Sequence, residues 1–207
     1  MPVPQRRTQR ERREGTIRKL LDAATDTLIE RGYAEASVQR ICERAEVSQG
    51  ALFRHFASRE ALMVAVAEDI ADQLLARYRR KFLALDRADR ADLEAALRLV
   101  REACRSQLNQ AWYELAMAAR TNANLRKALE PMAERYFDAI ARLARELLPE
   151  LAAALGDTFD VLVGTVLAVF DGEVGQRYVI RQPKLEEARI DLLVGAVTSL
   201  VAQRARR

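Results

Sequence analysis

The side chains best suited to chemistry lie close together, in the stretch from Ser48 to His55. Gln49 carries a paired amide donor and acceptor, which matches the edge of an adenine base, and Arg54 carries a planar cation that pairs with guanine or with a phosphate. Gly50 has no side chain, so the backbone there can approach a phosphate closely. These residue types predict a surface that contacts DNA.

Two short helices separated by a tight turn at Ala45–Val47 would present this surface. Ser37 and Ser48 can each cap a helix start by accepting an N–H from the first turn. Apolar residues recur on one face of each helix, namely Val38, Ile41, Cys42 and Ala45 in the first and Ala51, Leu52 and Phe56 in the second. The outer side of the second helix keeps Gln49, Gly50, Arg54 and His55. This pattern is typical of a helix-turn-helix, which sets its second helix in the major groove. The alternative is a small helical hairpin with a solvated face.

An amphipathic helix precedes the pair, from Thr16 to Arg31, with Gly32 as a left-handed cap at its end. Its apolar stripe consists of Ile17, Leu20, Leu21, Ala24 and Leu28. Three helices of this size can share one small core, to which Tyr33 and Phe53 can contribute aromatic rings.

The stretch from Thr16 to Leu62 resembles the N-terminal domain of the tetracycline-repressor (TetR/AcrR) family of bacterial regulators. The matching residues are Ala23-Ala24, Glu30-Arg31-Gly32-Tyr33, Ser37-Val38, Ile41, Ala45, Val47-Ser48, Gly50-Ala51-Leu52-Phe53, His55-Phe56 and Ser58-Arg59-Glu60-Ala61-Leu62. The rest of the chain resembles the family only in length and helical character.

The resemblance implies an all-α fold in three parts. Residues 1–15 are expected to be a flexible basic arm, residues 16–62 a three-helix helix-turn-helix domain, and residues 63–207 a larger helical domain for effector binding and dimerisation. The DNA-contacting residues that it implies are Ser37, Gln39, Ser48, Gln49, Gly50, Ala51, Phe53, Arg54, His55 and Arg59.

Two residues depart from the family pattern. Glu46 stands in the turn where most members have Gly, and a left-handed backbone at a residue other than glycine costs about 1–2 kcal/mol. Phe53 stands where the family more often has Tyr, so it lacks a hydroxyl for a phosphate and is expected to serve in packing alone.

Composition favours helix throughout, because half of the 207 residues are apolar and only eight are Gly and five Pro. The net charge of +4 is uneven, since residues 1–19 hold seven basic and only two acidic side chains. A basic arm before a DNA-contacting domain can follow phosphates or enter a minor groove. The alternative is a solubilising tail.

The sequence offers little for catalysis. His55 is the only histidine and belongs to the second short helix, and there is no phosphate-binding glycine loop and no Cys/His spacing for a metal. No catalytic residue, cofactor or metal is therefore predicted, and Cys42 is interpreted as a small core residue. The basic N-terminus lacks a following apolar run, and the charge-free apolar stretches are too short for a membrane span. A cytoplasmic location without a membrane partner fits this composition.

The C-terminal part is predicted as longer helices, beginning with one from Arg59 to Leu85 and a polar connector at Asp86–Asp92. The last two, Asp157–Ile180 and Lys184–Arg204, are apolar on most of their circumference, which predicts burial on more than one side. The family typically dimerises through these helices, and the interface residues assigned on that basis are Leu162, Val166, Phe170, Leu192, Leu193, Ala196 and Leu200. The alternative is that both helices form the core of the monomer.

Family members commonly bind a small molecule among the helices of the second part. Bulky and acidic residues on the middle helices are the candidates to line such a pocket, namely Trp112, Tyr113, Met117, Phe137, Phe170, Glu114 and Glu173. Acidic groups facing the pocket would favour a cationic ligand. Ordinary core packing is the alternative for each bulky residue.

These observations favour a sequence-specific regulator that binds a two-fold symmetric double-stranded DNA operator as a homodimer. Because the family mostly represses and commonly binds a small molecule, the resemblance implies a ligand-responsive repressor. A helical dimeric interaction protein without a specific DNA target is the main rival, and it predicts no salt-sensitive affinity for DNA. A protein that coats DNA without preference is a second rival.

Overall fold

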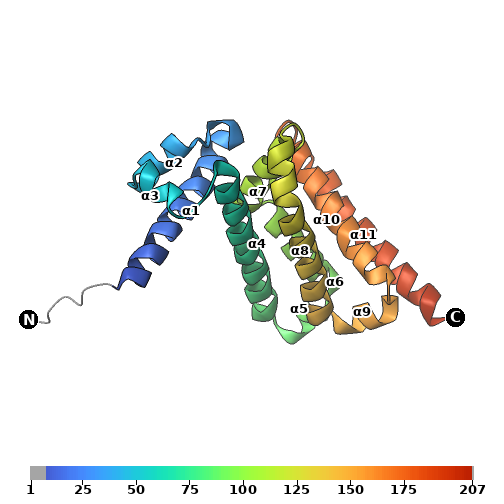
Figure 1. Ribbon diagram of the computed structural model, residues 1–207. Helices are drawn as coiled ribbons and strands as arrows, with labels where there is room; N and C mark the ends of the chain where they lie inside the picture. Colours follow the sequence, from blue (N-terminus) through green and yellow to red (C-terminus); the bar gives the residue numbers. More distant parts are fainter. Residues whose placement is uncertain (1–7, 207) are drawn as a thin grey trace, which may run out of the picture. The chain divides into compact units, whose positions relative to one another are not determined.

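The computed structural model describes residues 8–206, which form helices and no strand (Figure 1). The all-α prediction is confirmed. The helices in chain order are α1 (Gln9–Glu35), α2 (Val38–Ala45), α3 (Gln49–Phe53), α4 (Arg59–Ala84), α5 (Arg87–Ala91), α6 (Leu93–Cys104), α7 (Gln107–Ala119), α8 (Ala123–Leu147), α9 (Pro149–Leu155), α10 (Thr158–Arg177) and α11 (Pro183–Ala205).

The chain divides into two compact units that do not follow the expected boundary at residue 62. The first unit combines residues 8–71 with 110–133, and the second combines residues 72–109 with 134–206. Helices α4, α7 and α8 each contribute to both. The first unit therefore contains the three N-terminal helices together with the first half of α4, most of α7 and the start of α8.

The first helix begins earlier than the sequence pattern suggested. Thr8 caps it by accepting a hydrogen bond from the Glu11 N–H at 3.2 Å, and the Glu11 carboxylate accepts one from the Thr8 N–H at 2.7 Å. This capping box satisfies two of the N–H groups that a helix start leaves free. Residues 9–15 of the expected arm are thus helical, and Arg6 and Arg7 lie outside the described residues.

The three N-terminal helices share one core, seen beside one another in Figure 1. The side chains of Leu20, Leu28, Ile41 and Leu52 are fully buried in it. Gly32 breaks α1 with φ 75° and ψ 174°, so the positive φ fits the prediction but the conformation is not the left-handed helical one. Helical turns resume after it and continue to Glu35.

The turn between α2 and α3 contains the left-handed residue that was considered from the sequence at Glu46. Glu46 adopts φ 55° and ψ 43°, which is the left-handed region, and its N–H donates to the Glu43 carbonyl at 3.3 Å. The next N–H, of Val47, donates to the Cys42 carbonyl at 3.0 Å. The left-handed backbone at Glu46 turns the Val47 N–H back toward Cys42, so the chain accepts a strained residue to make the turn.

Replacing Glu46 with glycine should therefore stabilise the protein. Relief of the left-handed strain is partly offset by the greater freedom of glycine in the unfolded chain, which leaves a gain of about 0.5–1 kcal/mol in the free energy of unfolding. Urea denaturation followed by circular dichroism measures it. Glu43→Gly, inside α2, is the matched control and should lower the same quantity by about 1 kcal/mol. Equal losses in both variants would contradict the strain at Glu46.

The second unit is organised around a core shared by α6, α10 and α11. Six buried residues from these helices form it: Leu97, Cys104, Val166, Phe170, Val174 and Ile190. A smaller cluster of Ala152, Leu155 and Phe159 joins α9 to α10. The predicted connector differs from expectation, because residues 86–92 contain the short helix α5.

Buried charges also join these three helices. Glu186 on α11 is 5% exposed and Glu173 on α10 is 2% exposed. Arg105, which follows α6, donates to both, at 2.8 Å to Glu186 and 2.5 Å to Glu173. Arg177 also pairs with Glu186, and Arg189 with Glu173 at 3.2 Å. Each buried carboxylate thus has two cationic partners, as a charge removed from water requires.

No single helix within residues 8–206 has the length and hydropathy to cross a membrane. Only α9 and α10 counted together reach that limit, and they are bent by 114° at the break between them.

Candidate nucleic-acid interface

Helix α3 is a single short segment held at both ends and exposed along one side. Ser48 caps it, its Oγ accepting from the Ala51 N–H at 3.2 Å, and Leu52 is fully buried beneath it. Gln49 and Arg54 are exposed. The core below α3 therefore fixes a helix whose amide and guanidinium groups point to solvent.

Gly50 occupies an open position on the same exposed side. A Cβ built on Gly50 meets no described atom within 4 Å, and its φ is not positive. Neither backbone conformation nor packing within residues 8–206 requires glycine here. A requirement for glycine at this position would have to come from a partner that approaches the backbone.

Two residues of this segment lie differently from their predicted places. Phe53 was expected to serve in packing alone, but its side chain is 49% exposed and only partly packed against the protein. Its ring adds apolar surface to the exposed side of α3. His55 is half-buried rather than outward, and its Nδ1 is buried with no hydrogen-bond partner among the described residues.

Two more predicted contacts, Ser37 and Gln39, lie at the start of α2. Ser37 is exposed and caps the helix, its Oγ accepting from the Arg40 N–H at 3.2 Å. Gln39 is exposed, and its Nε2 donates to the Glu43 carboxylate at 2.9 Å. Contact between Gln39 and a base or phosphate would have to compete with this bond.

Arg59 at the start of α4 has partners within the protein. Its Nε donates to the Ala36 carbonyl at 3.0 Å and its Nη2 to the Tyr33 carbonyl at 2.7 Å. Its guanidinium also lies 4.0 Å from the centre of the Tyr33 ring, within cation–π range. Arg59 is therefore a residue that secures the connection between α1 and α2, and the sequence did not indicate this role.

Several cations of α1 remain available to an outside partner. Arg18 pairs with Asp69 and Asp22, and Arg10 pairs with Glu14. The side chains of Arg12, Arg13 and Lys19, all on α1, make no ion pair with another described residue and are exposed. These three cations extend the basic surface toward the N-terminus.

Comparison with known proteins assigns the chain to a protein family. Residues 20–66 match the sequence profile described as "Bacterial regulatory proteins, tetR family". The chain is also 40% identical over 193 residues, covering 93% of this chain and 98% of its relative, to an uncharacterized HTH-type transcriptional regulator of Mycobacterium tuberculosis, Rv2912c. This protein belongs to the tetR family of bacterial regulatory proteins.

Two further similarities extend the assignment. The HTH-type transcriptional repressor Rv3405c of M. tuberculosis is 37% identical over 73 residues, 35% of this chain and 39% of its own. The crystal structure of the multidrug binding protein EbrR, complexed with imidazole, has a TM-score of 0.62 and 23% identity, and the likeness covers 89% of this chain and 93% of that one. The fold of this tetR-family regulator is therefore shared well beyond its N-terminal helices.

The residues predicted to line an effector pocket have varied surroundings in this tetR-family chain. Trp112 and Tyr113 are half-buried. Met117 and Phe137 are 59% and 50% exposed, which does not fit an enclosing wall. Phe170 is fully buried in the core of the second unit, where it fills space between helices.

The two acidic candidates have protein partners instead of open space. Glu173 pairs with Arg105 and Arg189. Glu114 accepts a hydrogen bond from the Tyr33 N–H at 3.1 Å. Because both carboxylates are engaged within the protein, the structure does not support the prediction that they select a cationic ligand. No three His, Cys, Asp or Glu side chains within the described range lie close enough to hold a metal ion.

Helices α10 and α11 run side by side (Figure 1), and each has an exposed stripe without charge. The stripe residues are Val161, Gly164, Thr165, Ala168, Gly172 and Gly175 on α10, and Leu185, Ala188, Leu192, Gly195, Ala196 and Ser199 on α11. Leu192 is 71% exposed and Val161 67%. We call these two rows the uncharged face.

The predicted interface residues fall only partly on the uncharged face. Leu192 and Ala196 lie on it, whereas Val166 and Phe170 are buried in the core of the same chain, so their assignment to an interface is wrong. Leu162, Leu193 and Leu200 are half-buried and pack against the cores of the second unit. On α10 the predicted residues follow the side that packs in the core, whereas on α11 two of the four predicted residues lie on the exposed row.

Proposed function

We propose that this tetR-family regulator is a ligand-responsive repressor that binds a two-fold symmetric DNA operator as a homodimer. The observation that carries the proposal is α3, a short capped helix fixed by a buried Leu52 and presenting Gln49, Gly50 and Arg54 to solvent. A regulator that acts on chromosomal DNA works in the cytoplasm of a bacterium.

The exposed side of α3 suits the edges of bases in a major groove. Gln49 can pair with adenine and Arg54 with guanine, and the exposed ring of Phe53 can contact the methyl group of thymine. Ser37, Gln39, Ser48, Ala51, His55 and Arg59 are proposed as the flanking residues of the contact. Arg12, Arg13 and Lys19 are proposed to meet phosphates, which supply affinity without sequence preference.

The uncharged face supports the homodimer. Large exposed apolar patches mark interaction sites, and these rows carry the exposed side chains of Val161, Leu185 and Leu192. Their small residues would let two helices approach closely. A two-fold pairing of α10 and α11 would cover both rows in one isologous interface. It would also present two copies of α3, as an operator with half-sites one DNA turn apart requires.

The effector and the repressor roles rest on relatives. EbrR is named a multidrug binding protein and Rv3405c a transcriptional repressor. By analogy, a small molecule would bind this chain among the helices outside α1 to α3. It would favour one of two spacings between the two copies of α3 in the dimer. Trp112 and Tyr113 are the retained candidates for that contact.

Selection of binding sites from random duplexes with the purified protein tests the proposal. The expected result is a two-fold symmetric consensus whose half-sites are about 10 base pairs apart from centre to centre. Recovery of an asymmetric or single half-site would contradict the dimer. Equal retention of all duplexes would contradict a specific regulator.

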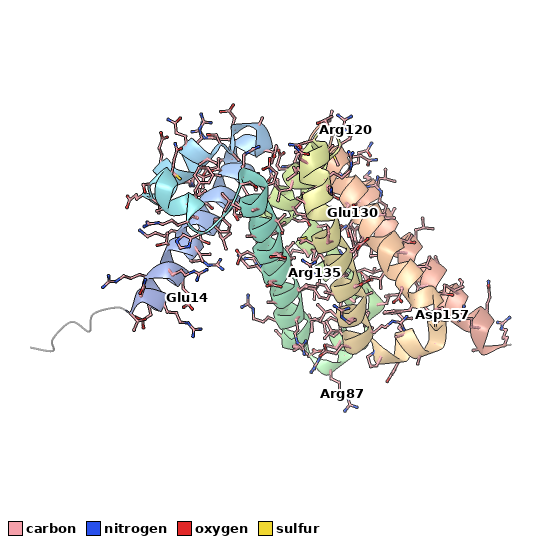
Figure 2. The ribbon with its side chains drawn as sticks, viewed as in Figure 1. Glu14, Arg87, Arg120, Glu130, Arg135 and Asp157 are labelled. Atoms are coloured by element: carbon pink, nitrogen blue, oxygen red, sulfur yellow. The ribbon has the colours of Figure 1, made fainter. Side chains whose placement is uncertain are left out.

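Arg54→Ala should weaken binding to the selected operator. If Arg54 pairs with a base, the loss is about 1–3 kcal/mol and discrimination at one position of each half-site relaxes. Fluorescence anisotropy at fixed salt measures both effects. Arg120, which is exposed on the first unit after α7 (Figure 2), offers the control, because Arg120→Ala removes the same charge away from α3. Equal affinities of the two variants would remove Arg54 from the contact.

A further inference from the structure

The connection between α1 and α2 is held from outside by side chains of three later helices. Tyr33 is at its centre, directly after the break at Gly32. Its N–H donates to the Glu114 carboxylate on α7, its carbonyl accepts from Arg59, and its ring faces the Arg59 guanidinium. Its hydroxyl lies 3.5 Å from Nδ2 of Asn122, which caps α8 by accepting from the Leu125 N–H.

The break at Gly32 is shaped for the Glu114 carboxylate. A Cβ built at Gly32 would lie 2.8 Å from Oε2 of Glu114, closer than real Cβ contacts allow, and the φ of +75° is itself unfavourable for a side chain. Glycine is thus suited to this position both by its backbone and by the space it leaves. The interruption of α1 frees the Tyr33 N–H from the helix, and Glu114 is the acceptor that replaces the helical carbonyl.

The three-helix head, which consists of α1 to α3, has buried side chains of its own. Leu20, Leu28, Ile41 and Leu52 on these helices are fully buried. Glu114 joins the end of α1 to α7, a helix of the part of the chain that lies after residue 62. Residues 110–133 belong to the same compact unit as the head.

From this geometry we infer that Glu114 is a positioning residue for operator binding, which holds the head in one orientation on α7 through the Tyr33 N–H. The inference rests on the proposed homodimer. A dimer binds a two-fold operator tightly only if both heads are held at the spacing of the half-sites, because the second contact then forms at high effective concentration. A single half-site needs only the head. Loss of the Glu114 contact should therefore weaken the full operator much more than the half-site.

The test compares three variants of Glu114 that separate the length of the side chain from its charge. Glu114→Gln keeps a side-chain oxygen at the same reach without the charge. Glu114→Asp keeps the charge but is one methylene shorter, and Glu114→Ala removes the acceptor. The matched control is Glu130→Ala, which removes an exposed carboxylate from the same unit on α8 (Figure 2).

Anisotropy titrations are made with the selected operator, with a single half-site and with operators carrying one or two additional central base pairs. We expect Glu114→Ala and Glu114→Asp to lower affinity for the operator at least ~10-fold while half-site affinity stays within about twofold, and to reduce the preference for the native spacing. Glu114→Gln and Glu130→Ala should behave as the wild type. A ratio of operator to half-site affinity that is unchanged, or a parallel loss of both, overturns the inference.

Hydrogen exchange of peptides that span residues 32–37 gives a second readout without DNA. Exchange should be faster in Glu114→Ala and Glu114→Asp, and unchanged in Glu114→Gln and Glu130→Ala. Equal exchange in all variants overturns the inference whatever the DNA results. If the wild type selects no duplex, the proposed function fails. Faster exchange in Glu114→Ala and Glu114→Asp alone would then still support the hydrogen bond between Glu114 and the Tyr33 N–H.

Discussion

Leu192→Glu should convert the protein to a monomer and lower its affinity for the operator by about 10²–10⁴-fold. Leu192 is 71% exposed at the middle of the uncharged face, so a carboxylate there is solvated in the single chain. In a two-fold pairing of α10 and α11, the same carboxylate would be buried against its copy or against apolar neighbours. Burying an unpaired charge is costly enough to separate the subunits.

Sedimentation velocity measures the mass of the variant, and anisotropy with the full operator and a half-site measures the DNA effect. Leu83→Glu is the matched control, since Leu83 is 50% exposed on α4 and lies outside the uncharged face. Circular dichroism should show the same helix content in both variants. A Leu192→Glu protein that still sediments as a dimer would place the interface elsewhere. Leu193→Glu is a poorer test, because Leu193 packs against the core of its own chain.

Glu186→Ala should lower the free energy of unfolding by about 3–5 kcal/mol at neutral pH, because it leaves a buried cluster of cations without its carboxylate. The Glu186 side chain is 6% exposed, and it accepts from Arg105 at 2.8 Å, from the Gln182 N–H at 3.3 Å, and from Arg177. Arg105 and Arg189 would then share the carboxylate of Glu173, and Arg177 would lose the carboxylate of Glu186. The cost therefore combines lost attraction with repulsion among the arginines.

The effect should depend on pH in a definite direction. Burial raises the pKa of Glu186, but the Gln182 N–H and the charges of Arg177 and Arg105 outweigh it, so the pKa lies below the ordinary value of 4.5. A carboxyl group with a lowered pKa in the folded state stabilises the protein above its unfolded pKa, and this contribution is lost as the pH falls through the folded value. The difference in stability between wild type and Glu186→Ala should shrink below about pH 4.5.

Urea denaturation of both proteins between pH 3 and pH 7 measures this difference. The control is Glu146→Ala, since Glu146 pairs with Arg79 in the same unit while both side chains are about half exposed. A surface pair of this kind contributes at most about 1 kcal/mol. Equal losses from the Glu186 and Glu146 variants would show that the buried cluster contributes no more than a surface pair.

Much of the three-helix head could be predicted from local sequence. The caps Ser37 and Ser48, the apolar spacing of α2 and the short α3 depend on interactions within a few residues, and such interactions are visible in the order of the chain. The left-handed Glu46 was anticipated for the same reason. Even the longer α1 had a local sign, because Thr8 and Glu11 stand at the spacing of a capping box.

The partners of acidic residues could not be predicted in this way. Glu114 meets Tyr33 across 81 positions of sequence, and Glu173 meets Arg105 across 68. Nothing in the local pattern around Glu114 distinguishes a carboxylate that serves a distant backbone N–H from one that faces a ligand. The exposed rows of α10 and α11 were predicted only in part, at Leu192 and Ala196. Both helices are apolar on most of their circumference, so periodicity alone does not say which side the core covers.

The order of residues thus determined which helices form, where they begin, and that Gln49 and Arg54 stand on a capped helix next to a buried Leu52. Caps, turns and one-face spacing act over one or two helical turns, so sequence neighbours are sufficient to fix them. Tertiary packing alone decided that Glu114 completes the end of α1, that Arg59 faces Tyr33, and that Leu192 is left exposed while Phe170 is enclosed. Those outcomes depend on which distant surfaces meet when apolar area is buried, and this depends on residues along the whole chain.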